Sequence, residues 1–279
     1  MVYASILGNR AVIALNGAEA RDFLQGLITN DMEACSEGHA VYAALLTPQG
    51  KILFDFFVVA NGEDRWLLDC GASRAAELVK RLTLYRLRAR VEITPRADLA
   101  VAALWNDGDT TDAQGDAVVF PDPRLRELGI RMIGTRTALG EATRSMAAGD
   151  YDAHRLALGI PDSADLPPDQ IFALDAGFEE LDGVSFKKGC YVGQEVTARM
   201  KHRASARRRF LTAELAGEMP PGTSLEAGGR ELGTLASGKG GRALALVRLD
   251  RLADAEEKQT PITAAGRQVI LRKPGWLKL

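Results

Sequence analysis

The sequence predicts an α+β region followed by a small all-β domain. As far as about Arg209, strand-like and helix-like segments alternate without a strict strand–helix–strand repeat, which favours α+β over a doubly wound sheet. Beyond Arg209, short β-rich runs are separated by glycine pairs and prolines, as in a small barrel or sandwich. We therefore place a domain boundary near residue 206, with residues 206–279 as a C-terminal β domain.

The individual elements follow from hydrophobic periodicity and from turn residues. A strand at 10–15 leads into a helix at 18–25, and the turn Pro48-Gln49-Gly50 joins the two strands of a hairpin. Ser73 is expected to cap an amphipathic helix over 73–87. The remaining expected segments are strands at 41–47, 51–60, 66–70, 91–94, 99–105, 117–120, 129–133, 209–215, 223–226, 231–236, 243–249 and 268–271, and helices at 138–148 and 151–158.

Length and composition are those of a soluble globular protein. The chain has 279 residues, of which 46% are hydrophobic and 26% charged, enough for a sizeable core in one large or two ordinary domains. No apolar run in the sequence approaches the ~18 residues that cross a bilayer, and no basic flank precedes the apolar N-terminal stretch. We therefore expect a cytoplasmic monomer with no membrane partner.

Cysteine and histidine usage argues against a disulfide framework and against a structural metal. Cys35, Cys70 and Cys190 are odd in number and widely spaced, which suits reduced thiols. The three histidines are also scattered, so the sequence has no Cys/His cluster with metal-ligand spacing. The sequence predicts no metal site.

Residues 188–195, Lys-Gly-Cys-Tyr-Val-Gly-Gln-Glu, are the best functional clue in the chain. Cys190 lies between two glycines, behind a pair of lysines, and just before a helix expected to begin at Gln194 or Glu195 and to end at His202. The glycines let backbone amides approach a sulfur or an anion, and lysines and a helix N-terminus favour a reactive thiol. A buried structural cysteine is the alternative, but the charged, glycine-flanked setting favours a functional thiol.

A basic stretch overlaps and follows this octapeptide. Residues 187–209 hold eight Lys or Arg residues against the single acid Glu195, although the whole chain has a net charge of −2. Such a stretch is either an anion-facing surface or a solvated face. Its position next to Cys190 favours the first interpretation.

Motifs for nucleotide binding and serine hydrolysis are incomplete or missing. Residues 233–240 nearly match a phosphate-binding loop, but Gly240 stands where Ser or Thr would hold magnesium, and a strand is expected where a helix should follow. Neither Gly-x-Gly-x-x-Gly nor Gly-x-Ser-x-Gly occurs in the sequence. These features argue against nucleotide hydrolysis, a Rossmann cofactor and a serine nucleophile.

Two polar positions upstream have more than one interpretation. Asp55 lies inside an apolar run between Phe54 and Phe56, where an unpaired carboxylate is costly. It is therefore either a functional acid or the partner of an arginine. The pair Asn30-Asp31 follows the first helix, where a turn or a helix cap is expected.

The octapeptide also carries a family resemblance. Residues 183–203, Gly-Val-Ser-Phe-Lys-Lys-Gly-Cys-Tyr-Val-Gly-Gln-Glu-Val-Thr-Ala-Arg-Met-Lys-His-Arg, resemble the signature of the YgfZ family of folate-binding proteins, relatives of the glycine-cleavage T-protein (aminomethyltransferase). The resemblance extends to residues 23–31, Phe-Leu-Gln-Gly-Leu-Ile-Thr-Asn-Asp, and to residues 47–55, Thr-Pro-Gln-Gly-Lys-Ile-Leu-Phe-Asp. With the β-rich tail, it covers essentially the whole chain.

The resemblance implies a T-protein-like fold, with two intertwined α+β parts around a central folate opening and a C-terminal β-barrel. The folate-binding region would span residues 1–205, with about 1–95 and 150–205 in one part and 96–149 in the other. The implied ligand is tetrahydrofolate or a one-carbon derivative, and the implied partners are iron–sulfur assembly or client proteins. The implied role is iron–sulfur cluster assembly or repair, which indirectly supports tRNA thiomodification.

The resemblance also assigns roles to residues. Cys190 matches the functional thiol of the family, and Asp55 is the candidate catalytic acid. Arg10 and Arg155 stand where a family member carries tryptophan, so here an arginine would face the folate glutamyl carboxylates. The expected folate-binding residues are Arg10, Asn30, Asp55, Arg155, Lys188, Gly189, Gln194, Glu195 and Arg199.

Two alternatives stay open. True aminomethyltransferases carry paired carboxylates where this chain has Phe54-Asp55, so proton handling at the folate nitrogen should suffer and glycine-cleavage activity is not expected. A folate-dependent one-carbon transferase that uses Asp55 alone is the enzyme alternative. The second alternative is tRNA binding through the basic residues 201–209. The absence of aromatic residues within this run argues against it, because such residues would stack on the bases.

Overall fold

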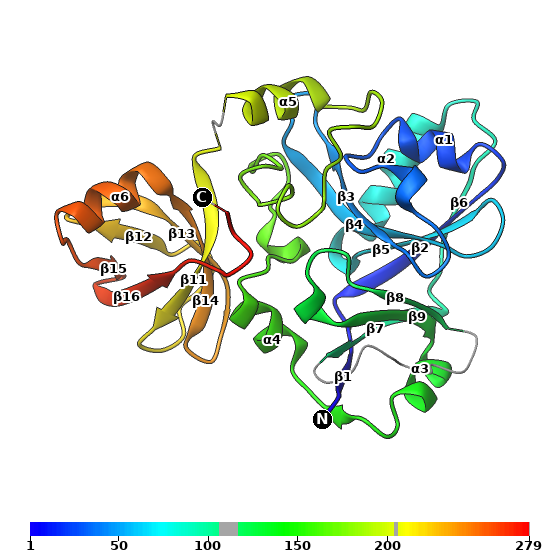
Figure 1. Cartoon of the computed structure of the whole chain (residues 1–279). Helices are drawn as coiled ribbons and strands as arrows, with labels where there is room; N and C mark the ends of the chain where they lie inside the picture. Colours follow the sequence, from blue (N-terminus) through cyan, green and yellow to red (C-terminus); the bar gives the residue numbers. More distant parts are fainter. Residues whose placement is uncertain (106–116, 204–205, 279) are drawn as a thin grey trace.

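The computed structural model describes residues 1–105, 117–203 and 206–278. Its β structure comprises two five-stranded sheets in the first part of the chain and a closed six-stranded barrel in the second (Figure 1). The predicted α+β class and C-terminal barrel are therefore confirmed. Residues 204 and 205, next to the predicted domain boundary, lie outside the described residues.

The first sheet is antiparallel and carries two helices on one face. Val12 and Ala14 belong to a core shared with the second sheet, whereas Ile13 and Leu15 pack with the helices, as the period of two in a strand requires. The elements are β2 (Arg10–Asn16), β3 (Val41–Leu46), β4 (Ile52–Ala60), β5 (Arg65–Gly71), β6 (Glu92–Pro95), α1 (Ala20–Gln25) and α2 (Ala75–Arg86), with strand order β3-β4-β5-β2-β6.

The second sheet combines the N-terminal strand with strands from the middle of the chain. Its elements are β1 (Tyr3–Ile6), β7 (Leu99–Trp105), β8 (Val118–Pro121), β9 (Ile130–Thr135), β10 (Ala147–Ala148) and α3 (Arg136–Ala142), with strand order β10-β1-β7-β9-β8. From the sequence, we expected residues 1–95 to lie in one part of the fold and residues 96–149 in the other. Strand β1 differs from this expectation, because Tyr3 to Ile6 pair with Trp105 to Ala102 in the second sheet.

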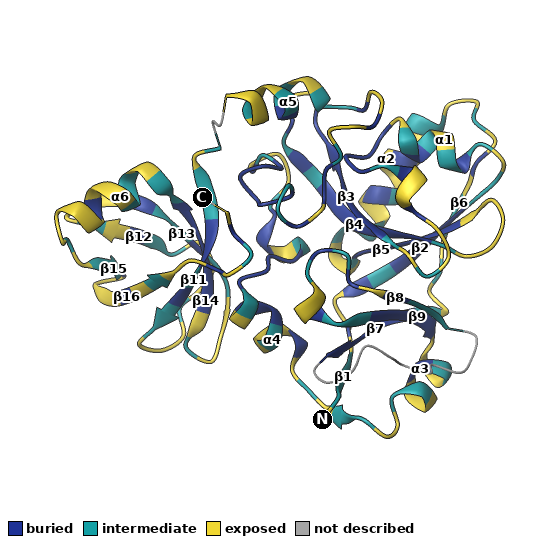
Figure 2. Ribbon diagram, in the orientation of Figure 1, coloured by how far each residue is buried: buried dark blue, intermediate teal, exposed yellow. Residues whose placement is uncertain are grey.

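The inner faces of the two sheets meet in one hydrophobic core. Val12, Phe57 and Leu67 of the first sheet pack there with Val101 and Ile133 of the second. In Figure 2 the central strands β4, β5, β7 and β9 are largely dark blue, while yellow segments lie on the helices and loops. Any charged residue at an inward position of these strands is therefore removed from water, and needs a partner.

A segment with little regular structure connects the two sheets to the barrel. It contains α4 (Tyr151–Leu158), a 3-10 turn η4 (Ser163–Asp165) and α5 (Gln194–His202). The predicted helix that follows the octapeptide is thereby confirmed, with its first residue at Gln194. Trp276, near the C-terminus, donates from Nε1 to the carbonyl oxygen of Leu158 at 2.9 Å, which ties the barrel to α4.

The barrel closes in the order β11-β14-β13-β12-β15-β16. The sequence did not predict the nine-residue helix α6 or the three-residue strand β15. Gly233 to Lys239, the segment that nearly matches a phosphate-binding loop, lies within β13, so the argument against that motif is confirmed. The elements are β11 (Arg208–Leu215), β12 (Ser224–Ala227), β13 (Arg230–Lys239), β14 (Arg242–Arg248), α6 (Leu249–Glu257), β15 (Ile262–Ala264) and β16 (Arg267–Arg272).

Two local predictions are wrong. Ser73 does not cap α2, because a 3-10 turn at Ala72–Arg74 precedes the helix and no side chain caps it. The helix expected over 138–148 ends at Ala142, because the chain then turns so that β10 can pair with β1. Among the described residues, no helix is both long and apolar enough to cross a membrane.

Candidate functional site

Cys190 lies exposed in a loop that leads into α5. The loop is pressed against the hairpin turn between β3 and β4 at Gly193, whose φ of +83° is one that a residue with a side chain rarely adopts. A Cβ at Gly193 would lie 2.6 Å from the carbonyl oxygen of Thr47. Beside the cysteine, Gly189 has open space where its Cβ would be, so the loop is tightly packed at its base and open around the thiol.

Lys188 anchors this loop from below. Its Nζ donates to the carbonyl oxygens of Gln25 and Ile28, both at 2.7 Å, and of Asn30 at 2.8 Å. Burial lowers the pKa of Lys188 to about 8. All three ammonium protons are used, so Lys188 holds the loop to the end of α1 and has no proton left to donate to a ligand.

The segment around Asn30 forms the floor of the same loop. Asn30 donates from Nδ2 to the carbonyl oxygens of Tyr42 at 2.9 Å and Asp182 at 2.7 Å. Thr29 donates from its hydroxyl to the carbonyl oxygen of Gly183 at 2.6 Å. The bonds from Asn30 to Asp182 and from Thr29 to Gly183 join residues about 150 positions apart. The segment 23–31 therefore supports the segment that leads into the cysteine loop.

The remaining predicted residues of this region lie on the first turns of α5. Glu195 and Arg199 form an exposed i,i+4 ion pair with 2.7 Å between Oε1 and Nη2, a type of pair with little effect on stability. Gln194 is the half-buried first residue of the helix. Phe186, 39% exposed, lies under the ammonium group of Lys201 at 5.6 Å from its ring centre.

A second cluster, which we call the central ion-pair cluster, lies between the two sheets. It contains Arg10, Asp69, Asp122, Arg124, Arg131 and Asp162, all buried. Arg10 is 2.6 Å from Asp69 and 2.9 Å from Asp162. Arg131 is 2.6 Å from Asp69 and 2.9 Å from Asp122, and Asp122 is 2.8 Å from Arg124.

Side chains alternate between the two faces of a strand, and this alternation places the cluster between the two sheets. Arg10 shares the inward parity of Val12 on β2, Asp69 that of Leu67 on β5, and Arg131 that of Ile133 on β9. The Phe57 ring lies against the guanidinium groups, with the Arg131 Cζ 4.0 Å from its centre. Nearby arginines hold the pKa of Asp122 and of Asp162 well below the usual range, against the burial that alone would raise it.

Asp55 and Arg155, two predicted folate contacts, lie at the edge of this cluster. Asp55 is buried and accepts a hydrogen bond from the Tyr42 hydroxyl at 3.2 Å. Burial raises the pKa of Asp55, and Arg10 opposes that shift. Arg155 is 2.9 Å from Asp165 and 2.8 Å from Asp152. Asp55 is hydrogen-bonded to Tyr42 and forms no ion pair with an arginine among the described residues, so both interpretations of this carboxylate stay predictions.

The predicted residues therefore divide between two places. Lys188, Gly189, Cys190, Gln194, Glu195 and Arg199 lie in and after the cysteine loop, with Asn30 beneath it, whereas Arg10, Asp55 and Arg155 lie in or beside the centre. The sequence reasoning missed Asp69, Asp122, Arg124, Arg131 and Asp162. Asp69 and Arg131 carried a signal, because each interrupts an apolar strand as Asp55 does.

The residues at the centre do not fit a bound tetrahydrofolate. Ligands of this size occupy pockets of about 300–1,000 Å³. The cavity at Asp55 lies at the margin of the first sheet, where Ser163 and Leu78 of α2 also line it, and its volume is about 30 Å³, room for about one water molecule. Arg10 and Arg155, expected to face the glutamyl carboxylates, are bound to aspartates of the chain itself.

Metal ligation is also limited. The part of the chain that the structure describes holds no group of three or more His, Cys, Asp and Glu residues able to bind a metal ion. Cys35 and Cys70 are buried, and burial raises the pKa of Cys35 to about 11 and that of Cys70 to about 12. Of the three thiols, only Cys190 is exposed.

Comparison with known proteins places the chain in a family. Residues 8–105 match the model of the GCVT N-terminal domain, and residues 207–279 match that of the CAF17 C-terminal β-barrel domain. The chain is 32% identical over 275 residues to the mitochondrial iron–sulfur cluster assembly factor IBA57 of Homo sapiens, covering 88% of this chain and 77% of that protein. The chain belongs to the CAF17/IBA57-like family. The IBA57 factor of Mus musculus is 31% identical over 277 residues, with the same coverage.

The fold of this IBA57-like chain is also that of a solved T-protein. The crystal structure of the glycine cleavage system aminomethyltransferase T from Bartonella henselae has a TM-score of 0.78, at 17% identity, over 99% of this chain and 86% of that one. The expected T-protein-like fold is thereby confirmed. The resemblance to the YgfZ family holds at the level of the wider CAF17/IBA57-like family, since the relatives found are IBA57 factors.

Proposed function

We propose that the chain is an accessory factor in iron–sulfur cluster assembly, and that Cys190 is the thiol through which it acts. The relatives that define the family are named as iron–sulfur cluster assembly factors. The observation that carries the assignment to a residue is the exposure of Cys190 on a loop held by Lys188 and Gly193. An exposed thiol on a fixed loop is suited to meet a partner.

An iron–sulfur cluster is usually held by four cysteine thiolates, and Cys190 could supply one of them. Because the described residues hold no group of three or more His, Cys, Asp and Glu residues able to bind a metal ion, a cluster contacted by this sulfur would take most of its other ligands from a partner protein. The chain is therefore proposed to act together with an iron–sulfur carrier or client, and support of tRNA thiomodification would be an indirect result of that action.

The two alternatives have less support. Asp55, the single acid of the transferase hypothesis, is buried beside Arg10 rather than open to a substrate. The basic stretch proposed for tRNA, residues 201–209, is partly neutralised, because Lys201, Arg208 and Arg209 pair with Glu179, Asp175 and Glu180. A cytoplasmic location and a monomeric state stay predictions; size-exclusion chromatography tests the second.

Replacement of the thiol tests the proposed function. In a strain that lacks its own factor of this type, we expect Cys190→Ser to leave iron–sulfur enzyme activity at the level of the empty vector, because serine retains the shape of the loop but not the sulfur. Gly189→Ala is the matched control, since its added Cβ meets open space; it should restore activity fully. Full rescue by Cys190→Ser at equal protein level would contradict the role of the thiol.

A further inference from the structure

We propose that the centre of this T-protein-like fold is filled by the central ion-pair cluster and takes no folate, so that the chain acts without folate bound between its sheets. This inference concerns the centre alone. It does not depend on Cys190, and it would stand if the proposed role of that thiol failed.

The charges of the cluster are balanced within the chain. Arg10, Arg124 and Arg131 face Asp69, Asp122 and Asp162, three cations against three anions. The spare donors are also used: Arg10 reaches the Asp69 carbonyl at 2.8 Å, and Arg124 reaches the Pro161 carbonyl at 3.2 Å. A folate that entered would have to displace pairs of this kind, and each broken pair would leave an uncompensated buried charge.

The cluster also binds the separate parts of the fold to one another. Arg10 and Asp69 belong to the first sheet, Arg131 belongs to the second, and Asp162 belongs to the connecting segment. Close by, Asp165 accepts from Arg155 of α4 at 2.9 Å and from the backbone N–H of Ser237 in the barrel at 2.7 Å. Opening the centre would therefore require the first sheet, the second sheet and the barrel to move apart at the same time.

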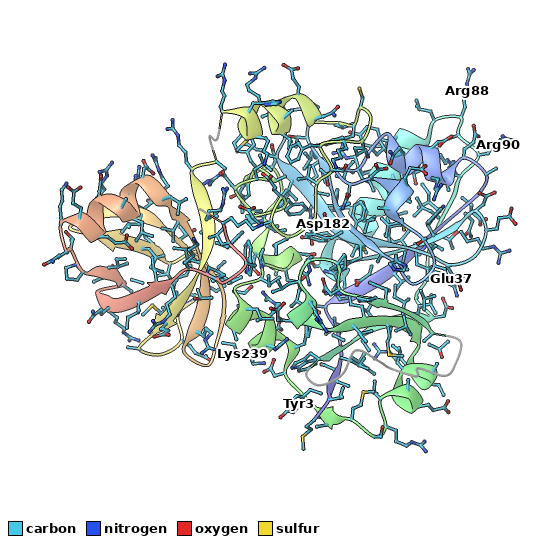
Figure 3. All side chains as sticks on the ribbon, viewed as in Figure 1. Tyr3, Glu37, Arg88, Arg90, Asp182 and Lys239 are labelled. Atoms are coloured by element: carbon cyan, nitrogen blue, oxygen red, sulfur yellow. The ribbon has the colours of Figure 1, made fainter. Side chains whose placement is uncertain are left out.

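The larger groove beside the cluster has no unpaired cation in its lining that could bind a folate tail. Its volume is about 440 Å³, and its lining includes Asp150, Asp152, Asp162 and Lys239. Lys239, labelled in Figure 3 where the barrel approaches α4, is 2.6 Å from Asp150, so this cation is already paired. The other two carboxylates are paired as well, Asp152 with Arg155 and Asp162 with Arg10, so the groove lining presents no unpaired cation to the glutamyl carboxylates of folate.

Equilibrium dialysis of the full chain against tetrahydrofolate tests the inference, with an aminomethyltransferase dialysed in parallel as the positive control. At ligand concentrations up to about 1 mM, where even a binding free energy near −4 kcal/mol gives half occupancy, we expect no saturable uptake by the wild type.

The variant Asp55→Asn decides where any binding occurs, because Asp55 is buried beside the central ion-pair cluster and asparagine is nearly isosteric with it. One folate per chain, with affinity reduced at least tenfold by Asp55→Asn and unchanged by the exposed control Lys187→Ser, would overturn the inference. Uptake that Asp55→Asn leaves unchanged would place the ligand outside the centre, and the inference on the centre would hold.

Discussion

Lys188 anchors the loop that presents Cys190, because its ammonium group donates to three carbonyl oxygens at the end of α1. The sequence suggested that the lysine pair lies behind the thiol to supply charge. The structure instead separates the two lysines: Lys187 is exposed, whereas Lys188 is 7% exposed and faces the backbone. Adjacent identical residues thus have different roles, and no sequence pattern distinguishes them.

This difference gives a prediction for Lys188→Met, with Lys187→Met as the matched control. At pH 7 we expect Lys188→Met to lower the free energy of unfolding by about 2 kcal/mol, because three buried carbonyl groups lose their donor. Lys187→Met should change it by less than about 0.5 kcal/mol. Urea unfolding measures both, and equal effects would contradict the anchoring role.

The pH dependence of the same variant has a defined sign. The folded pKa of Lys188, about 8, lies below the ordinary lysine value of 10.5, so the unfolded chain binds more protons between these two values. Wild-type stability should therefore include a contribution that rises as the pH increases from about 8 to about 10.5. Lys188→Met should lack this rise, and Lys187→Met should retain it.

At the element scale, the turn of the β3–β4 hairpin and the start of α5 fit together at Gly193. The left-handed backbone of Gly193 lets α5 begin directly above the hairpin turn, with the Thr47 carbonyl beneath it. The glycines of the octapeptide are therefore not equivalent. Gly193 is required by packing, and Gly189 leaves space around the sulfur.

We therefore expect Gly193→Ala to destabilise the protein by about 2 kcal/mol, since it combines an unfavourable φ with a contact to backbone. It should also reduce complementation although Cys190 is intact, because the loop must move. Gly189→Ala should do neither. Thermal unfolding and complementation measured on both variants test this, and a Gly193→Ala protein with wild-type stability would contradict it.

The elements that the sequence predicted well are those with a strong local pattern. The hairpin of β3 and β4, the strand β5 and the helices α2 and α4 all show clear periodicity or turn residues, and all are present. β10, by contrast, is two residues long and exists through its pairing with β1. The central ion-pair cluster could not be predicted, because its partners lie from 2 to 152 positions apart and meet only after both sheets have formed.

At the scale of the whole molecule, the two sheets and the connecting segment share buried charges as well as a hydrophobic core. Such a buried pair need not add stability over an apolar pair of the same shape. Removal of one partner is different, because it leaves the opposite charge buried and unpaired. Asp69, which contacts both Arg10 and Arg131, is the residue where this loss should be largest.

We predict that Asp69→Asn destabilises the protein by about 3–5 kcal/mol, which corresponds to a fall in Tm of about 10 °C for a chain of this size. The matched control is Asp98→Asn, which removes a carboxylate from the exposed pair with Arg96 and should lower Tm by no more than about 2 °C. Differential scanning calorimetry of the two variants tests this, and similar Tm values would show that the cluster does not hold the sheets together.

The filled centre has a consequence for the kinetics of association at the Cys190 loop. If no ligand opens the space between the sheets, the loop, which Lys188 and Gly193 hold at its base, is expected to keep its backbone arrangement when a partner binds. Docking on such a preformed surface requires backbone shifts of less than about 1 Å, so the association rate constant should be set by diffusion and orientation, in the range of about 10⁵–10⁷ M⁻¹s⁻¹. Differences in affinity among partners would then arise mainly from how long each complex lasts.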